Sequence, residues 1–150
     1  MKKTQKKLGN KGFSLVELIV VIAIMAVLVG VLAPTLIKNI EKSRESKDAQ
    51  NCEQLKSSVE IALQNETAYS ENVVSGGNDI VTIGANGKAT VNDKSTAAAG
   101  SKAFTNELDG QIDTTKFELT SKKYKNAAKN GGIKINVNEK GQVTIVGLPS

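Results

Sequence analysis

An uninterrupted apolar stretch near the N-terminus constrains the fold of this chain more than any other feature. Leu18–Ala33 comprises sixteen residues without a polar side chain. With its flanks, the apolar segment 13–37 would form a helix about 37 Å long at ~1.5 Å per residue. Since the hydrocarbon layer of a bilayer is about 30 Å thick, the sequence predicts a segment able to cross a membrane.

Charge sets the expected orientation of this segment. Five lysines precede it, and no acidic residue occurs before Glu17. Because Lys and Arg favour the cytoplasmic side, we expect the N-terminus inside and the rest of the chain outside. From Phe13 onward there are 15 basic and 15 acidic residues, so the positive charge belongs to the first eleven positions. These equal numbers of basic and acidic residues disfavour a nucleic-acid partner bound on a broad basic face, without excluding nucleic acid altogether.

Several side chains needed for common chemistry are scarce. The chain of 150 residues has no His and no Trp, and its one Cys cannot form an internal disulfide. Histidine catalysis and histidine metal sites are therefore excluded. No nucleophile–base pair or phosphate-binding loop stands out. We expect neither an enzyme nor a cofactor or metal site.

The helical pattern continues beyond the apolar stretch. We predict one helix from about Phe13 to about Asn65, because no Gly or Pro follows Pro34 before Gly76. Its second half is amphipathic. The polar run 41–51 is expected to lie outside any core. Ion pairs are predicted for Arg44 with Asp48 and for Lys56 with Glu60, four residues apart. The apolar stripe contains Cys52, Leu55, Val59, and Ala62 or Leu63.

Short β-type runs and turn residues fill the remainder. Alternating residues predict one hairpin over Asp79–Asn92 and a second over 133–145, turning at Asn138–Gly141. Ser95–Ser101 is expected to be a loop, Lys102–Leu108 a short helix and Phe117–Leu119 a strand. The four lysines of the cluster 122–129 are expected on a solvated face. A sheet this small needs the stripe on the helix as its other layer, which predicts an α+β fold.

One octapeptide carries a specific resemblance to a known family. Lys11–Leu18, which reads KGFSLVEL, resembles the processing site of type IV prepilins and related pseudopilins. It combines a short Lys-rich leader ending in Gly12, an aromatic Phe13 at the start of the apolar helix, and a Glu four residues later. The resemblance implies a pilin fold, in which a long helix packs on a small antiparallel sheet. The motif itself covers Gly12–Glu17, and the wider pattern reaches Pro34.

The resemblance also implies roles for individual residues. A prepilin peptidase would cut between Gly12 and Phe13 and methylate the new N-terminus at Phe13. Glu17 would then pair with the N-terminal amine of a neighbouring subunit and assist its entry into the fibre. A charge at the centre of a membrane segment costs roughly 2.5–3.5 kcal/mol, so a plain anchor would not explain Glu17.

Gly30 and Pro34 are expected to weaken the helix. Pro34 lacks an N–H and clashes with the carbonyl of Gly30, and in pilins a proline at this place marks a kink. The family often has a further Gly in the membrane segment, where this chain has Met25 and Ala26. Many pilins of double-membraned bacteria also close a C-terminal loop with a disulfide, and this chain has none. The pattern is more similar to pilins of Gram-positive bacteria such as clostridia.

The resulting organisation has three parts. We expect a removable leader over 1–12, a membrane and assembly segment over 13–37, and an extracellular pilin domain over 38–150, in which the helix ends at about 66. The function implied is a structural subunit of a type IV pilus used for adhesion, twitching motility or DNA uptake. The implied partners are copies of itself, a prepilin peptidase, an assembly ATPase and a membrane platform protein. The chain would lie in the cytoplasmic membrane before assembly and on the cell surface afterwards.

Other functions remain open at this stage. A pseudopilin of a secretion or competence machine would share the N-terminal motif. An uncleaved, single-span surface-binding protein would share only the apolar segment. A secretory signal peptide would explain the basic start, but Pro34 directly after the small residue Ala33 disfavours cleavage there.

Overall fold

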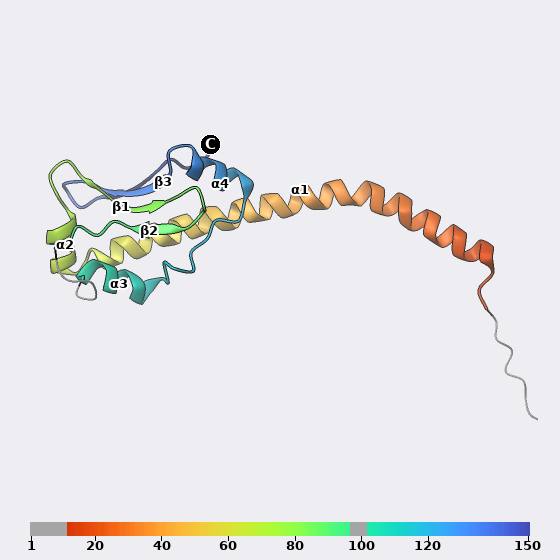
Figure 1. The fold of residues 1–150 in the computed structure, drawn as a ribbon, viewed down its shortest axis with the longest axis horizontal. Helices are drawn as coiled ribbons and strands as arrows, with labels where there is room; N and C mark the ends of the chain where they lie inside the picture. The colour runs from red at the N-terminus through yellow and green to blue at the C-terminus, as the bar shows by residue number, and fades with distance from the viewer. Residues whose placement is uncertain (1–11, 97–101) are drawn as a thin grey trace, which may run out of the picture. The chain divides into compact units, whose positions relative to one another are not determined.

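The structure, a computed structural model, describes residues 12–96 and 102–150. It falls into two units, one ending at Asn39 and one covering Ile40–Ser150, which we call the folded unit. The elements follow in the order α1 (Leu15–Ala62), α2 (Glu66–Asn72), β1 (Asn78–Ile83), β2 (Ala89–Val91), α3 (Ala103–Gln111), α4 (Lys122–Lys129), β3 (Ile133–Val137) and β4 (Val143–Val146). Figure 1 shows the sheet lying along the second half of α1. The expected α+β fold is confirmed.

The sheet has four antiparallel strands in the order β2-β1-β3-β4. Both expected hairpins are present. The first is β1 with β2, and the second is β3 with β4, so β1 and β3 pair at the centre. A bulge between Asp79 and Val81 interrupts the β1–β3 register, and Ile80 within it is buried. An extra residue in one strand re-aims side chains locally, which allows both Ile80 and Val81 to enter the core.

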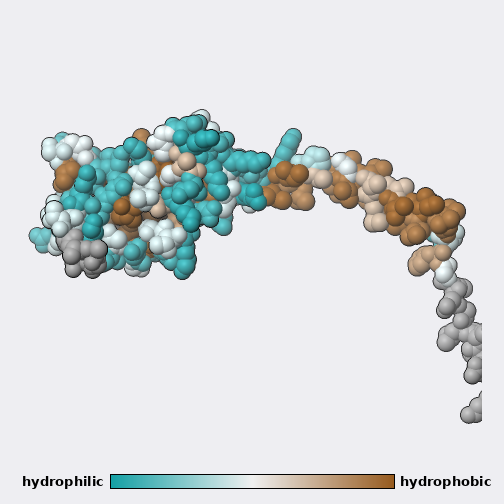
Figure 2. Space-filling model, in the orientation of Figure 1, coloured by the Kyte–Doolittle hydropathy of each residue, from teal (hydrophilic) through white to brown (hydrophobic). Residues whose placement is uncertain are grey.

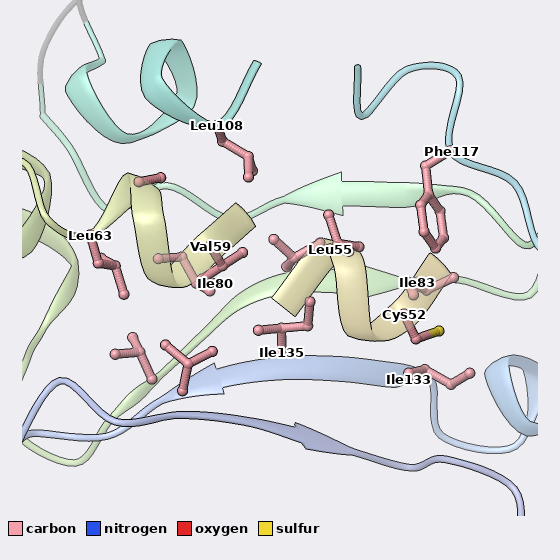
Figure 3. Packing of buried hydrophobic residues seen from close by; sticks show 14 of the residues in the cluster. Cys52, Leu55, Val59, Leu63, Ile80, Ile83, Leu108, Phe117, Ile133 and Ile135 are labelled. Carbon is pink, nitrogen blue, oxygen red and sulfur yellow. The ribbon is translucent and has the colours of Figure 1, made fainter. Parts of the chain in front are cut away.

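The core forms where the sheet meets the stripe on α1. The stripe side chains point toward Ile80, Ile83, Ile133 and Ile135 of the sheet (Figure 3). Every predicted member of the stripe is buried, namely Cys52, Leu55, Val59, Ala62 and Leu63. Leu108 from α3 and Phe117 from the following loop complete the same cluster. Residues three and four apart on one helix therefore supply the second layer that the small sheet needs.

The sequence predicted that the polar part of α1 lies outside the core, and this prediction is wrong at Asp48 and Ala49. Asp48 is fully buried, and Ala49 packs against the core. The Asp48 carboxylate accepts the backbone N–H of Thr120 at 3.0 Å and that of Ser121 at 2.7 Å. The predicted Arg44–Asp48 pair is therefore wrong, and Arg44 instead lies 3.7 Å from Glu41. The pair of Lys56 with Glu60 is confirmed at 3.7 Å.

A second carboxylate of α1 holds the same segment. Glu41 accepts the backbone N–H of Lys122, the first residue of α4. Asp48 and Glu41 are seven residues apart, so about two helical turns place them on the same side of α1. Three consecutive N–H groups at the start of α4 thus donate to two carboxylates. The positive end of the α4 dipole also stabilises the negative charge of these carboxylates. We call this contact the α1–α4 clamp.

A glycine allows a turn to approach the clamp. Gly87, in the turn between β1 and β2, accepts the N–H of Leu119 at 2.9 Å. Its φ is +78°, and a Cβ there would lie 3.2 Å from the carbonyl oxygen of Leu119. Only glycine adopts this conformation without strain, so Gly87 helps to position the residues that bind Asp48.

Two short helices were missed by the sequence reasoning. Asn65 caps α2, accepting the N–H groups of Thr67 and Ala68 at 3.0 and 3.2 Å. For that reason α1 ends at Ala62 rather than at about Asn65. Ser121 caps α4 by accepting the N–H of Tyr124. Asn and Ser are strong N-cap residues, so both starts carried a sequence signal.

The three remaining local predictions have different outcomes. The helix expected over Lys102–Leu108 is confirmed as α3. The strand expected at Phe117–Leu119 is wrong, because the described chain has there only a single bridge between Lys88 and Glu118. Most of the loop expected at Ser95–Ser101 lies outside the described residues.

Cys52 is confirmed as a core residue. It is 1% exposed, and burial, together with the Asp48 and Glu53 carboxylates, raises the pKa of its thiol to about 12. Since the thiolate is the reactive form, Cys52 is expected to be inert in the folded protein.

The first prediction concerns the α1–α4 clamp. Asp48→Ala is expected to lower the free energy of unfolding by about 2–4 kcal/mol, because it leaves buried N–H donors without acceptors. Asp48→Asn should fall between Asp48→Ala and wild type. The measurement is denaturant unfolding of the full chain in detergent, followed by circular dichroism of the sheet. Glu60→Ala, which removes only an exposed ion pair, is the control. Equal stability of Asp48→Ala and this control would contradict the role of the clamp.

The second prediction concerns Cys52. Maleimide should label it far more slowly in the folded chain than after unfolding, since a pKa near 12 leaves about a thousandfold less thiolate than the ordinary thiol pKa. Ser57→Cys adds an exposed thiol on the same helix as an internal control. Mass spectrometry of labelled peptides separates the two sites. Comparable labelling rates in the folded state would show that Cys52 is accessible.

Candidate functional site

The first turn of α1 contains the residues that the sequence analysis singled out. Ser14 precedes the helix as its N-cap, and Glu17 is the third helical residue. The backbone N–H of Ser14 donates to Oε2 of Glu17 at 2.8 Å. The N–H of Leu18 donates to the carbonyl oxygen of Ser14 at 3.2 Å and closes the turn.

This contact gives Glu17 a partner within its own helix. A Glu at the third helical position that reaches back to the N-cap N–H is one half of a capping box. Its negative charge also lies at the positive end of the helix dipole, which stabilises it. The sequence reasoning missed this role, although Ser14-Leu15-Val16-Glu17 has the S-x-x-E spacing of such a box. Glu17 therefore caps the helix that carries it.

Phe13 and Glu17 lie one turn apart on the same side of the chain. Together with Leu18 and Val21 they line an apolar hollow at the start of α1. The Phe13 side chain is 92% exposed. Gly12 directly precedes it, and an added Cβ at Gly12 would meet no atom within 4 Å. The structure thus brings together the predicted cleavage residues and the predicted assembly residue.

Gly30 and Pro34 lie elsewhere on α1 and are not part of this site. The helix continues through both positions without interruption. Because Pro34 has no N–H, the carbonyl of Gly30 lacks its usual partner four residues along. A Cβ at Gly30 would meet no atom within 4 Å, so packing does not require glycine there. A kink or local melting at these residues stays a prediction.

The apolar half of α1 has no cover in the described chain. All of its large apolar side chains between Phe13 and Ile37 are exposed. Figure 2 shows hydrophobic side chains over most of the visible face of this segment. The helix is long and apolar enough to cross a membrane. An apolar surface of this size needs either lipid or other protein around it.

Comparison with known proteins finds a family match at the same N-terminal segment. The family model for the prokaryotic N-terminal methylation motif matches residues 7–33. Over this N-terminal segment the chain is similar to type IV pilin precursors. The matched residues include the predicted cleavage residues Gly12 and Phe13, Glu17, and the whole apolar stretch Leu18–Ala33. The likeness is to a structural protein of the pilin type rather than to an enzyme.

The chain is also similar, over part of its length, to a curated protein. It is 40% identical over 68 residues to prepilin peptidase-dependent protein A of Clostridium perfringens (strain 13 / Type A). The aligned region covers 45% of this chain and 48% of the relative, so the chain spans about half the length of the curated protein it matches. No solved structure matches the chain significantly.

The lysine cluster predicted to be solvated lies on α4. Lys122, Lys123 and Lys129 are exposed, and Lys125 lies 3.6 Å from Glu118. Within residues 12–96 and 102–150, no group of three or more Cys, Asp or Glu residues is arranged to hold a metal ion.

Proposed function

We propose that this chain is the structural subunit of a type IV pilus. It would enter the cytoplasmic membrane as a precursor, lose residues 1–12, become N-methylated at Phe13, and polymerise into a surface filament. The observation that carries the proposal is the exposed apolar half of α1, with Gly12, Phe13 and Glu17 at its start. The match to the N-terminal methylation motif supports the same conclusion.

The exposed apolar surface explains why such a chain would have two destinations. A helix that is hydrophobic all round is stable only when lipid or other apolar side chains surround it. Lipid supplies that environment before assembly. A bundle of identical helices supplies it afterwards, with the folded units outside.

Glu17 links cleavage to assembly. Cutting before Phe13 creates an α-amino cation at a helix N-terminus, where the helix dipole disfavours positive charge. The Glu17 carboxylate one turn away offsets that charge. We infer that Glu17 exchanges its capping contact with Ser14 for the amine of a neighbouring copy during assembly.

The proposed partners follow from these steps. A prepilin peptidase would process the leader, in keeping with the name of the clostridial relative. Copies of the same chain would form the filament, driven by an assembly ATPase and a membrane platform protein. Adhesion, twitching motility and DNA uptake are the activities such a fibre would serve.

The third prediction tests processing. Intact-mass measurement of the chain from its own cell envelope should show loss of residues 1–12 and gain of one methyl group. Gly12→Val should retain the leader, because a branched side chain hinders the peptidase. Gly30→Val, at another glycine of the N-terminal segment where an added Cβ meets no atom within 4 Å, should still be cut. A full-length mass for the wild-type chain would favour the uncleaved single-span anchor.

The fourth prediction tests Glu17. Glu17→Ala and Glu17→Gln should insert and be cut normally, yet the yield of sheared filaments should fall by about tenfold or more, since the N-terminal cation lacks its counter-charge. Glu53→Gln, an exposed carboxylate on the same helix, is the control. Wild-type filament yield from Glu17→Ala would refute the assembly role. Electron microscopy of the same samples distinguishes long pili from the short fibres of a pseudopilin.

A further inference from the structure

The folded unit is neutral overall but divided in charge. Ile40–Ser150 contains 14 basic and 14 acidic residues. They are not mixed evenly, because the two ends of the unit have opposite net charge. We call these ends the α4 end and the α2 end.

Contacts between segments distant in the sequence define the α4 end. The α1–α4 clamp connects Glu41 and Asp48 of α1 to the start of α4. The N–H of Leu119 donates to the carbonyl oxygen of Gly87 in the β1–β2 turn. Segments 40–50, 84–88 and 112–132 thus form this end. It has nine basic residues against five acidic ones: Lys42, Arg44, Lys47, Lys88, Lys116, Lys122, Lys123, Lys125 and Lys129, against Glu41, Glu45, Asp48, Asp113 and Glu118.

Contacts around α2 define the other end. Asn65 donates to Glu107 of α3 at 3.1 Å, Asn72 donates to Asp93 at 3.2 Å, and Gly141 lies against Tyr69 of α2. This end has seven acidic residues against three basic ones: Glu60, Glu66, Glu71, Asp93, Glu107, Asp109 and Glu139, against Lys94, Lys102 and Lys140. Glu53, Lys56, Asp79 and Lys134 lie between the ends and balance each other.

The outer parts of the two ends are too far apart to neutralise each other, although the ends adjoin where Thr114 donates to Asp109 at 3.2 Å. Figure 1 shows α2 and α3 at one extremity of the folded unit and α4 toward the other. The helix from Glu41 to Ala62 alone covers about 30 Å at ~1.5 Å per residue. Salt screens exposed charges beyond about 8–10 Å. Each end therefore presents its own charge to an approaching molecule.

The acidic groups of the α4 end are largely occupied already. Glu118 pairs with Lys125, Asp113 lies 2.8 Å from Lys116, and the Asp48 carboxylate faces backbone N–H groups. In contrast, the exposed ammonium groups of Lys123 and Lys129 have no carboxylate partner in the described part of the chain. At the α2 end, Glu66 and Glu139 are exposed and likewise form no ion pair with a described residue. Unpaired charges of opposite sign thus remain at the two ends.

We propose that the α4 end of one copy docks on the α2 end of another copy, through ion pairs between these unpaired charges. When only one pair of ends meets, the contact is heterologous, because the other two ends stay free for further copies. Such a head-to-tail contact repeats into an open polymer. This inference rests on the proposed filament function and names the surfaces through which folded units meet. The acidic α2 end, equal and opposite in net charge, favours a second copy over an anionic membrane, which would need only the basic end.

Charge exchange in the full chain tests the proposal. Lys123→Glu/Lys129→Glu and Glu66→Lys/Glu139→Lys should each lower filament yield by about tenfold, because like charges would then face each other. The chain carrying all four substitutions should recover to within about threefold of wild type, since the pairs re-form with reversed sign. Lys94→Glu/Lys140→Glu is the matched control. It changes net charge as much as the first variant, but only adds acid to the acidic end, so it should assemble normally.

Each outcome has a distinct meaning. Loss in both reversed variants with recovery in the combined chain supports head-to-tail docking. Loss at the α4 end without recovery in the combined chain overturns it and indicates an anionic membrane surface instead. Wild-type yield from both reversed variants also overturns it, while leaving the filament function intact. Absence of filaments from the wild-type chain would instead refute the proposed function, and the cleavage state and membrane level of every variant confirm correct folding and insertion.

Discussion

The constraint on which the rest of this structure depends is that one continuous helix serves two environments. The first half of α1 exposes apolar side chains all round, and the second half buries one side, which contains Asp48, Ser58 and the apolar stripe that begins at Cys52. A backbone whose hydrogen bonds are internal to the helix can pass from lipid to water without leaving polar groups unpaired. The folded unit can therefore be built on the same helix whose other half is apolar enough to cross a membrane.

Two carboxylates on the polar part of α1 extend the contacts between this helix and the rest of the folded unit beyond the apolar stripe. Asp48 and Glu41 bind three successive N–H groups at the start of α4, and Gly87 lets the β1–β2 turn reach the same place. The segment between β2 and β3 is thereby held beside α1. This arrangement also gathers the lysines of α4 at one end of the unit, which is the basis of the head-to-tail contact inferred here.

Residues near one another in the chain were the easiest to predict. The stripe on α1, both hairpins and α3 follow from periodicity and turn residues, and Gly12, Phe13 and Glu17 were found as one motif. The exceptions were also local signals: the caps Asn65 and Ser121 and the S-x-x-E spacing at Ser14 were visible in the sequence but were overlooked. The burial of Asp48 was different, because its partners Thr120 and Ser121 lie more than seventy residues away.

The sequence by itself determined the apolar half of α1, its basic leader and the motif between them, since length, hydropathy and short-range spacing are properties of the chain alone. Only the tertiary structure decided that a polar stretch of helix enters the core and that balanced charges separate toward two ends. A buried carboxylate is tolerated when donors from a distant segment converge on it. That convergence depends on how the chain returns to α1, which no local pattern encodes.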